Sequence, residues 1–168
     1  MWRGSVSGKI PSKRSSLPQD AVKLSARTVG AENAKRIKRG MKSLSLALKW
    51  YLRAAFWAFA ISSLGQLFAQ RETAAASVWG FAPGWQREIG FFDLTIALLA
   101  FSATRTDDLR FQRHLVLAIV ILTLLVGTNH LFTVLSGTTG ALHEVFVGVN
   151  YVLVVGGVIA LTIQRDGP

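Results

Sequence analysis

The stretch LVLAIVILTLLVGTNHLFTVL, residues 115–135, decides the fold of this chain. It lies within a run of 30 residues without a formal charge, between Arg113 and Glu144, and a further 20 uncharged residues follow Glu144. A helix needs about 20 consecutive apolar residues to cross the hydrocarbon core of a bilayer. The pattern therefore predicts two neighbouring membrane spans, about 114–135 and about 142–163.

Two further apolar runs lie on the amino-terminal side. Arg53 and Arg71 are separated by 17 uncharged residues, and 11 uncharged residues follow Asp93 before the next charge. These runs predict spans at about 46–68 and about 87–104. The second is short and contains a carboxylate, so a segment that enters the membrane and returns on the same side is an alternative for it.

Basic and apolar residues are separated along the chain. The 168 residues carry 19 Lys and Arg against 9 Asp and Glu, and 51% are hydrophobic. Ten of the basic residues lie in residues 1–40, where Ser and Gly are frequent and no helical or strand period is sustained. We predict an all-α protein with a disordered basic tail, residues 1–43, and a bundle of four transmembrane helices, residues 44–168. At most a short helix near 31–39 is expected in the tail.

The chain contains no cysteine, which excludes disulfides, zinc–thiolate sites and thiol nucleophiles. The basic tail is expected to attract anionic lipids. A nucleic-acid partner is not predicted, because neither interleaved aromatic residues nor a known nucleic-acid-binding motif accompanies the charge. Met41 followed by Lys42 is typical of a translation start, so an alternative hypothesis takes residues 1–40 as an extension upstream of the natural start.

Loop charges set the expected orientation. Four crossings with the amino terminus inside place the basic tail, the arginines at 105–113 and Arg165 on the cytoplasmic side. Arg71 and Arg87 then lie outside, together with an aromatic-rich loop. Three crossings would place the cluster at 105–113 outside, against the positive-inside rule. Both termini are therefore expected in the cytoplasm.

Small and polar residues recur about every four positions in three of the predicted spans. Such stripes let the backbones of membrane helices approach closely, which matters because lipid gives no hydrophobic driving force between helices. The stripes are Ala54, Ala58, Ser62 and Gln66; Gly90, Asp93, Ala97 and Ala100; and Gly156 with Ala160.

Polar and ionisable side chains cluster near the outer ends of the predicted second, third and fourth spans. Such groups are costly in a membrane and by default face the bundle interior or a cavity. Asp93, His130 and Asn150 come from three helices yet lie at similar depths, which predicts an outward-facing polar pocket that Gln66 can join. The candidate ligand-binding residues are Glu88, Asp93, Asn129, His130, His143, Glu144 and Asn150.

Other interpretations of the same residues stay open. Asp93, His130 and Asn150 are also compatible with a structural role, in which interhelical hydrogen bonds of about 0.6 kcal/mol each fix the register of the bundle. A protonatable Asp–His pair is suited to proton relay or headgroup binding. The His-Glu segment at 143–144 is expected to be solvated at the interface, and a metal site combining it with Glu88 and His130 is not favoured by the spacing. No catalytic residue, cofactor or metal is predicted.

The run WQREIGFFDL, residues 85–94, is followed by Gly-Thr-Asn-His at 127–130 in the third span. Together they resemble a family of small bacterial four-helix membrane proteins known mainly as a domain of unknown function, with a looser likeness to DoxX-type proteins. The resemblance covers about residues 50–163 and implies a protein of the bacterial cytoplasmic membrane, without an activity. The family's polar positions correspond to Glu88, Asp93 and His130.

These observations leave three classes of function. As a structural or accessory membrane subunit, the protein would bind a membrane-protein partner or a second copy of itself through its small-residue faces. As a small transporter or binder, it would use the outer pocket for a proton, a lipid or a small polar ligand. As a DoxX-like oxidoreductase component, it would need a quinone or a metal, for which the sequence has no evident ligand set. The first class is the prediction, the other two are alternatives, and enzymatic activity is not expected.

Overall fold

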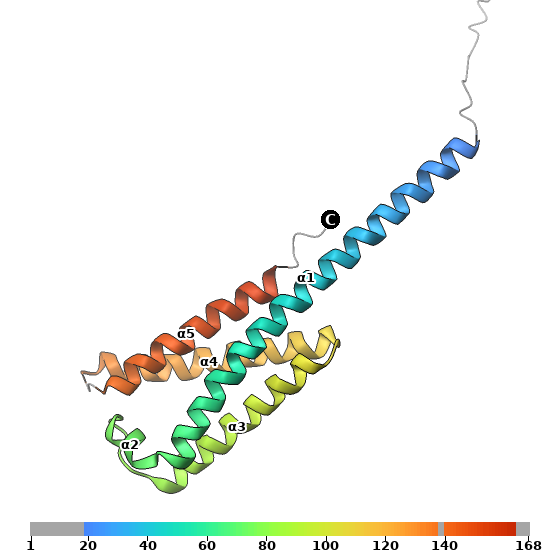
Figure 1. The fold of residues 1–168 in the computed structure, drawn as a ribbon. Coiled ribbons are helices and arrows are strands. Elements are labelled where there is room, and N and C mark those ends of the chain that lie inside the picture. The colour runs from blue at the N-terminus through green and yellow to red at the C-terminus, as the bar shows by residue number, and fades with distance from the viewer. Residues whose placement is uncertain (1–18, 138–139, 164–168) are drawn as a thin grey trace, which may run out of the picture. The chain divides into compact units, whose positions relative to one another are not determined.

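The computed structural model describes the backbone of residues 19–137 and 140–163, and side chains from residue 44 onward. Every regular element in these residues is a helix (Figure 1). The chain divides into two units, Met1–Ile37 and Lys38–Pro168, and all that follows on packing and on the site concerns the second unit. The helices are α1 (Gln19–Phe68), α2 (Gln70–Ala75), α3 (Pro83–Arg105), α4 (Leu109–Leu135) and α5 (Ala141–Thr162).

Three of the described helices are long and apolar enough to cross a membrane: residues Leu44–Phe68 of α1, all of α4 and all of α5. The all-helical fold predicted from the sequence is confirmed, and so are three apolar helices at the predicted places. α3 coincides with the predicted second span and has the length to cross. Its composition does not meet the same standard, because charged residues such as Arg87, Glu88 and Asp93 lie within it.

The amino-terminal part of the chain differs from the sequence prediction. α1 includes residues 19–43, for which a disordered tail with at most a short helix was predicted; residues 1–18 lie outside the described residues. Ala, Lys, Arg and Glu are good helix formers, and lengthening an existing helix needs no new nucleus. The absence of an amphipathic period in residues 19–43 therefore did not mean that these residues lie outside the helix.

The connection between α1 and α3 also contains more structure than a simple loop. The short helix α2 was not predicted. The Ala-Pro-Gly sequence at 82–84 contains the start of α3, with Pro83 in its first turn. Proline suits that place because its φ angle is preset and the missing N–H has no partner in a first helical turn.

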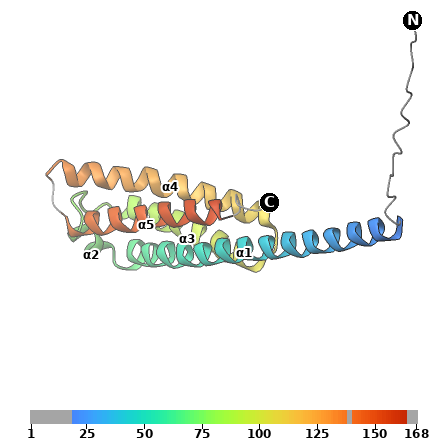
Figure 2. The same cartoon turned by 90° about the horizontal axis from the view of Figure 1, so that it is seen from above.

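α3 runs antiparallel to α1. Near the start of α3, Ser63 Oγ donates to the carbonyl of Gly90 at 2.9 Å. Just beyond its end, Lys49 Nζ lies 2.7 Å from Asp107 Oδ1. As the chain advances along α3, its partners therefore move backward along α1, and the two helices lie side by side in both views (Figures 1 and 2).

The end of the domain near Asp107 is densely packed. α1 contributes side chains at four-residue spacing, and Leu48 and Leu52 are fully buried there. Ala54, the first member of the predicted stripe on α1, is exposed, whereas its neighbour Ala55 is fully buried. The other buried members of this apolar cluster are Leu44, Tyr51, Ala100, Ala103, Leu115, Val116, Ile119, Val120, Leu153 and Ala160.

Two glycines allow α4 and α5 to approach closely. A Cβ atom on Gly157 would overlap Val120 Cγ2 and lie 3.0 Å from Tyr51 Cζ. A Cβ atom on Gly127 would lie 2.9 Å from Asn150 Cβ. The close approach on α5 is thus made at Gly157 rather than at the predicted Gly156, because Gly157 is the residue that faces α4.

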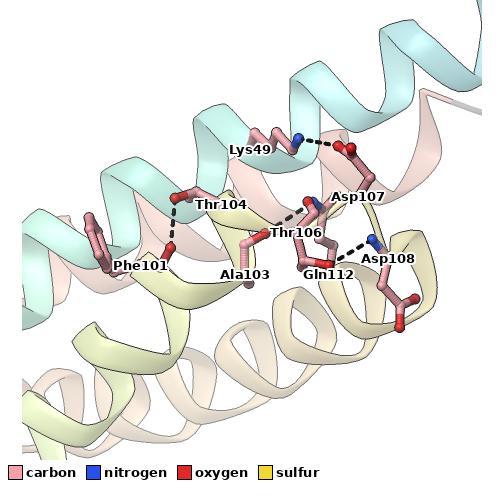
Figure 3. A network of polar contacts seen from close by, with 8 residues as sticks. All are labelled: Lys49, Phe101, Ala103, Thr104, Thr106, Asp107, Asp108 and Gln112. Carbon is pink, nitrogen blue, oxygen red and sulfur yellow. Dashed lines mark hydrogen bonds and ion pairs between the residues drawn. The ribbon is translucent and has the colours of Figure 1, made fainter.

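The turn between α3 and α4 is held by side-chain hydrogen bonds (Figure 3). The buried Gln112 side chain donates from Nε2 to the carbonyls of Ala103, at 3.1 Å, and Thr106, at 2.8 Å. Asp108 caps α4 by accepting from two backbone N–H groups in its first turn. The ion pair with Lys49 holds the pKa of Asp107, which lies between the helices, below its usual value.

The opposite end of the domain gathers α2, the segment after it, the end of α4 and the start of α5 (Figure 2). The backbone N–H of Leu142, at the start of α5, donates to the carbonyl of Ala76 at 3.4 Å. This end contains the cavity described next.

Candidate functional site

A cavity of about 660 Å³ lies among α1, α3, α4, α5 and the segment that precedes α3. Most of the side chains that line it are apolar or aromatic, as is usual for small-molecule sites. Each of the four long helices also contributes polar side chains. They are Ser62 and Gln66 from α1, Gln86 and Asp93 from α3, Thr123, Asn129 and His130 from α4, and His143 and Asn150 from α5.

The structure brings together five of the seven residues that the sequence singled out. Asp93, Asn129, His130, His143 and Asn150 line the cavity, as does Gln66, which was expected to join them. The two glutamates do not: Glu88 and Glu144 are exposed and lie outside the cavity lining. On α5, Glu144 follows the buried His143, and on α3, Glu88 lies midway between the buried Gln86 and Gly90, so helical spacing turns both carboxylates away from the buried face.

Asp93 is held against α1. Ser62 Oγ donates to its Oδ2 atom at 2.6 Å, and its other carboxylate oxygen has no hydrogen-bond partner among the described residues. α3 approaches α1 closely at this level because Gly90 has no side chain: a Cβ atom there would lie 2.7 Å from Leu67 Cδ2. The carboxylate is therefore fixed at the cavity wall by the α1–α3 contact.

Two histidines from neighbouring helices form a direct pair. His130 Nδ1 and His143 Nδ1 are 2.8 Å apart, and both side chains are buried. The prediction that the segment at 143–144 is solvated was therefore wrong for His143, which is fully buried, although Glu144 is exposed. The close approach of α4 and α5 at Gly127 lies one helical turn from this pair and brings the two rings together.

The segment after α2 completes the histidine site. The backbone N–H of Val78 donates to His143 Nε2 at 3.2 Å, and Ser77 Oγ lies at the same distance from that atom. The Trp79 ring stacks on His130, with centroids 5.0 Å apart, and meets His143 edge-on at 4.6 Å. Sequence reasoning missed these three residues, because it placed the aromatic-rich loop outside the membrane and predicted no contact between that loop and the helices.

These contacts fix the protonation of the pair. A backbone N–H can only donate, so His143 Nε2 must accept and the ring's proton is on Nδ1. That Nδ1–H donates to His130, whose Nδ1 therefore accepts and whose own proton is on Nε2. A second proton on either ring would place two N–H groups against each other. In this arrangement both imidazoles are uncharged.

Two glutamines leave acceptor oxygens buried near the cavity. Gln86 donates from Nε2 to the carbonyl of Gln70 at 2.9 Å, which fixes the orientation of its amide group. Its Oε1 atom and that of Gln66 are buried without a hydrogen-bond partner among the described residues. Unpaired buried acceptors cost free energy, so these two oxygens are polar groups that the packing near the cavity leaves unsatisfied.

The described residues contain no group of three or more His, Asp or Glu side chains arranged to hold a metal ion. The metal site considered from the sequence required Glu88 and Glu144 beside the two histidines. Both carboxylates are exposed and outside the cavity lining, so this set does not assemble.

Comparison with protein-family models, with curated proteins and with solved structures finds no match to this chain. A proposal for its function therefore depends on the geometry and chemistry of the cavity.

Proposed function

We propose that this protein is an integral membrane protein with four spans whose cavity binds a small molecule. The observation that carries this proposal is the cavity of about 660 Å³, with polar side chains from four helices in an otherwise apolar wall. Small-molecule sites typically have volumes of about 300–1,000 Å³, mostly apolar walls and a few convergent polar groups.

A membrane location is supported by the distribution of side chains. Large apolar residues such as Trp57, Ile61 and Leu125 are more than half exposed, whereas His143 and Gln112 are fully buried. A water-soluble helical protein shows the opposite arrangement. In lipid, exposed apolar side chains cost nothing and polar groups are satisfied inside the bundle.

The fourth crossing is supported by the pairing of α3 with α1. α3 contacts α1 through the Ser63–Gly90 hydrogen bond, and the turn just beyond α3 contacts α1 through the Lys49–Asp107 ion pair. Both α1 residues belong to Leu44–Phe68, so α3 runs beside a segment that is itself a candidate span. The 23 residues of α3 correspond to about 34 Å of helix, against about 30 Å for a bilayer core. Asp93, the residue that most weakens this span, is bonded to Ser62 at the cavity wall.

Single-cysteine labelling tests the topology directly, since the chain has no cysteine to remove. Glu72→Cys and Asp107→Cys place thiols at exposed positions before and after α3. With four crossings, a membrane-impermeant maleimide added to intact cells labels position 72 and leaves position 107 unlabelled until the cells are opened. Labelling of both positions on the same side would contradict a crossing by α3.

Native mass spectrometry of the protein extracted from membranes tests ligand binding. Ala58→Phe places a ring into the cavity, and Ala118→Phe makes the same change at an exposed position of α4 outside its lining. We expect the wild type and Ala118→Phe to carry a bound mass in a fixed ratio, and Ala58→Phe to lose it. A wild type without bound mass, or an equal mass on both variants, would contradict the proposal.

The inner-membrane location, cytoplasmic termini, attraction of the basic tail to anionic lipids and resemblance to the four-helix family stay predictions from the sequence. The same holds for the accessory-subunit and DoxX-like interpretations, since no contact in the described residues favours either one over ligand binding.

A further inference from the structure

The group of the cavity wall that most strongly selects a ligand is the carboxylate of Asp93. One of its oxygens accepts a hydrogen bond from Ser62, and the other has no partner among the described residues. A ligand that satisfies this second oxygen must bring a hydrogen-bond donor.

The described residues of the cavity wall include a negatively charged side chain but no positively charged one. Among the described residues that line the cavity, Asp93 is the only Asp or Glu, and no Lys or Arg is present. His130 and His143 add no positive charge, since the N–H of Val78 and the bond between the two rings require both to be neutral. An anion would meet a carboxylate without a cationic partner, whereas a cation would neutralise it.

The remaining wall favours an apolar or aromatic body on the ligand. Phe59, Trp85, Phe92 and Phe146 line the cavity with aliphatic side chains between them. Aromatic rings accept apolar groups and also attract cations to their faces.

We propose that the cavity binds a small organic ammonium ion with an apolar body, whose N–H groups donate to Asp93. This inference rests on the proposed function and specifies the ligand class of the same cavity.

Three compounds with one carbon skeleton test the charge requirement: 4-phenylbutylamine, 4-phenylbutanol and 4-phenylbutyrate. Their binding is measured by calorimetry at neutral pH to the full chain in phosphatidylcholine nanodiscs, with empty nanodiscs as the blank. The alcohol enters lipid at least as readily as the ammonium ion, so membrane partitioning does not produce a preference for the amine. We expect the amine to bind about tenfold or more tightly than the alcohol, and the acid to bind most weakly.

Two matched variants test whether Asp93 is the carboxylate that binds the amine. Asp93→Asn keeps the shape of the side chain and an acceptor for Ser62, and it should weaken the amine about tenfold or more while leaving the alcohol unchanged. Asp107→Asn makes the same substitution at an exposed carboxylate at the other end of the domain and should change neither. Circular dichroism confirms that each variant is folded, and the comparison of the three compounds on the wild type does not depend on either variant.

The outcomes separate the two proposals. Equal binding of amine and alcohol, with loss of both in Ala58→Phe, would overturn the ammonium inference and leave a ligand cavity. Tighter binding of the acid than of the amine would also overturn it. Absence of binding by all three compounds, together with no bound mass on the extracted wild type, would overturn both.

Discussion

At the end of the domain near Asp107, α1 presents Leu48 and Leu52, both fully buried, whereas at the other end it presents Ser62 and Gln66 to a cavity. The first end is filled by small and aliphatic side chains, which pack closely by dispersion. The second is hollow, with a mostly apolar wall in which Asp93 bonds to Ser62 and His130 to His143 across helices. One helix thus serves as packing surface over half of its span and as cavity wall over the other half, which separates the parts of the sequence that hold the bundle from those available to a ligand.

The largest expected effect is at the packed end. Gly157→Leu should destabilise the bundle by about 3 kcal/mol, because even a Cβ atom there overlaps Val120. Gly148→Leu is the matched control on the same helix, since a Cβ atom at Gly148 meets nothing within 4 Å. The measurement is reversible unfolding in mixed micelles, followed by circular dichroism. Similar stabilities for the two variants would contradict the close packing at Gly157.

The next effect is at the cavity end. His143→Phe removes the acceptor of Val78 N–H and the donor to His130, and it should cost about 2 kcal/mol locally. We expect the amide of Val78 to exchange with deuterium faster, with little change in the amides of the packed end. His114→Phe, at an exposed histidine of α4, is the control. Unchanged exchange at Val78 in His143→Phe would contradict the stabilising role of the hydrogen bond between Val78 N–H and His143.

A smaller effect is expected for Asp93→Asn. Ser62 can still donate to the amide oxygen, so the free energy of unfolding should change by about 0.6 kcal/mol or less. Unfolding in mixed micelles measures it, with Asp107→Asn as the control. A loss of several kcal/mol would assign Asp93 to holding the bundle together rather than to the ligand.

The smallest effect concerns the ion pair between Lys49 of α1 and the exposed Asp107 in the turn between α3 and α4. Lys49 lowers the pKa of Asp107, so the pair stabilises the fold above the usual aspartate pKa, and this contribution is lost as pH falls through the lowered value. Lys49→Met should return the pKa of Asp107 to its usual value, as followed by carboxyl carbon NMR. Because Asp107 is exposed, thermal unfolding at neutral pH should hardly change. An unaltered titration of Asp107 in this variant would contradict the pairing.

The sequence predicted much of the cavity, for a definite reason. Polar residues such as Asp93, His130 and Asn150 are rare in apolar spans and therefore stand out in the sequence. Their position, counted in residues from the outer end of each span, gives their depth, and side chains at equal depth on different helices can meet. It did not predict Trp79 or Ser77, because their positions depend on how the segment after α2 folds back over the bundle. It misplaced His143, since closeness to a helix end does not show whether another segment covers that end.

The lengths of the uncharged runs determined the class of fold by themselves, because the thickness of a bilayer sets a minimum for each apolar helix. Which face of each helix turns inward was decided only by tertiary packing. Leu, Ala and Gly stripes on these helices offer several nearly equivalent faces, and lipid does not penalise an apolar face that turns outward. Contacts between helices therefore selected Ala55 over Ala54 and Gly157 over Gly156.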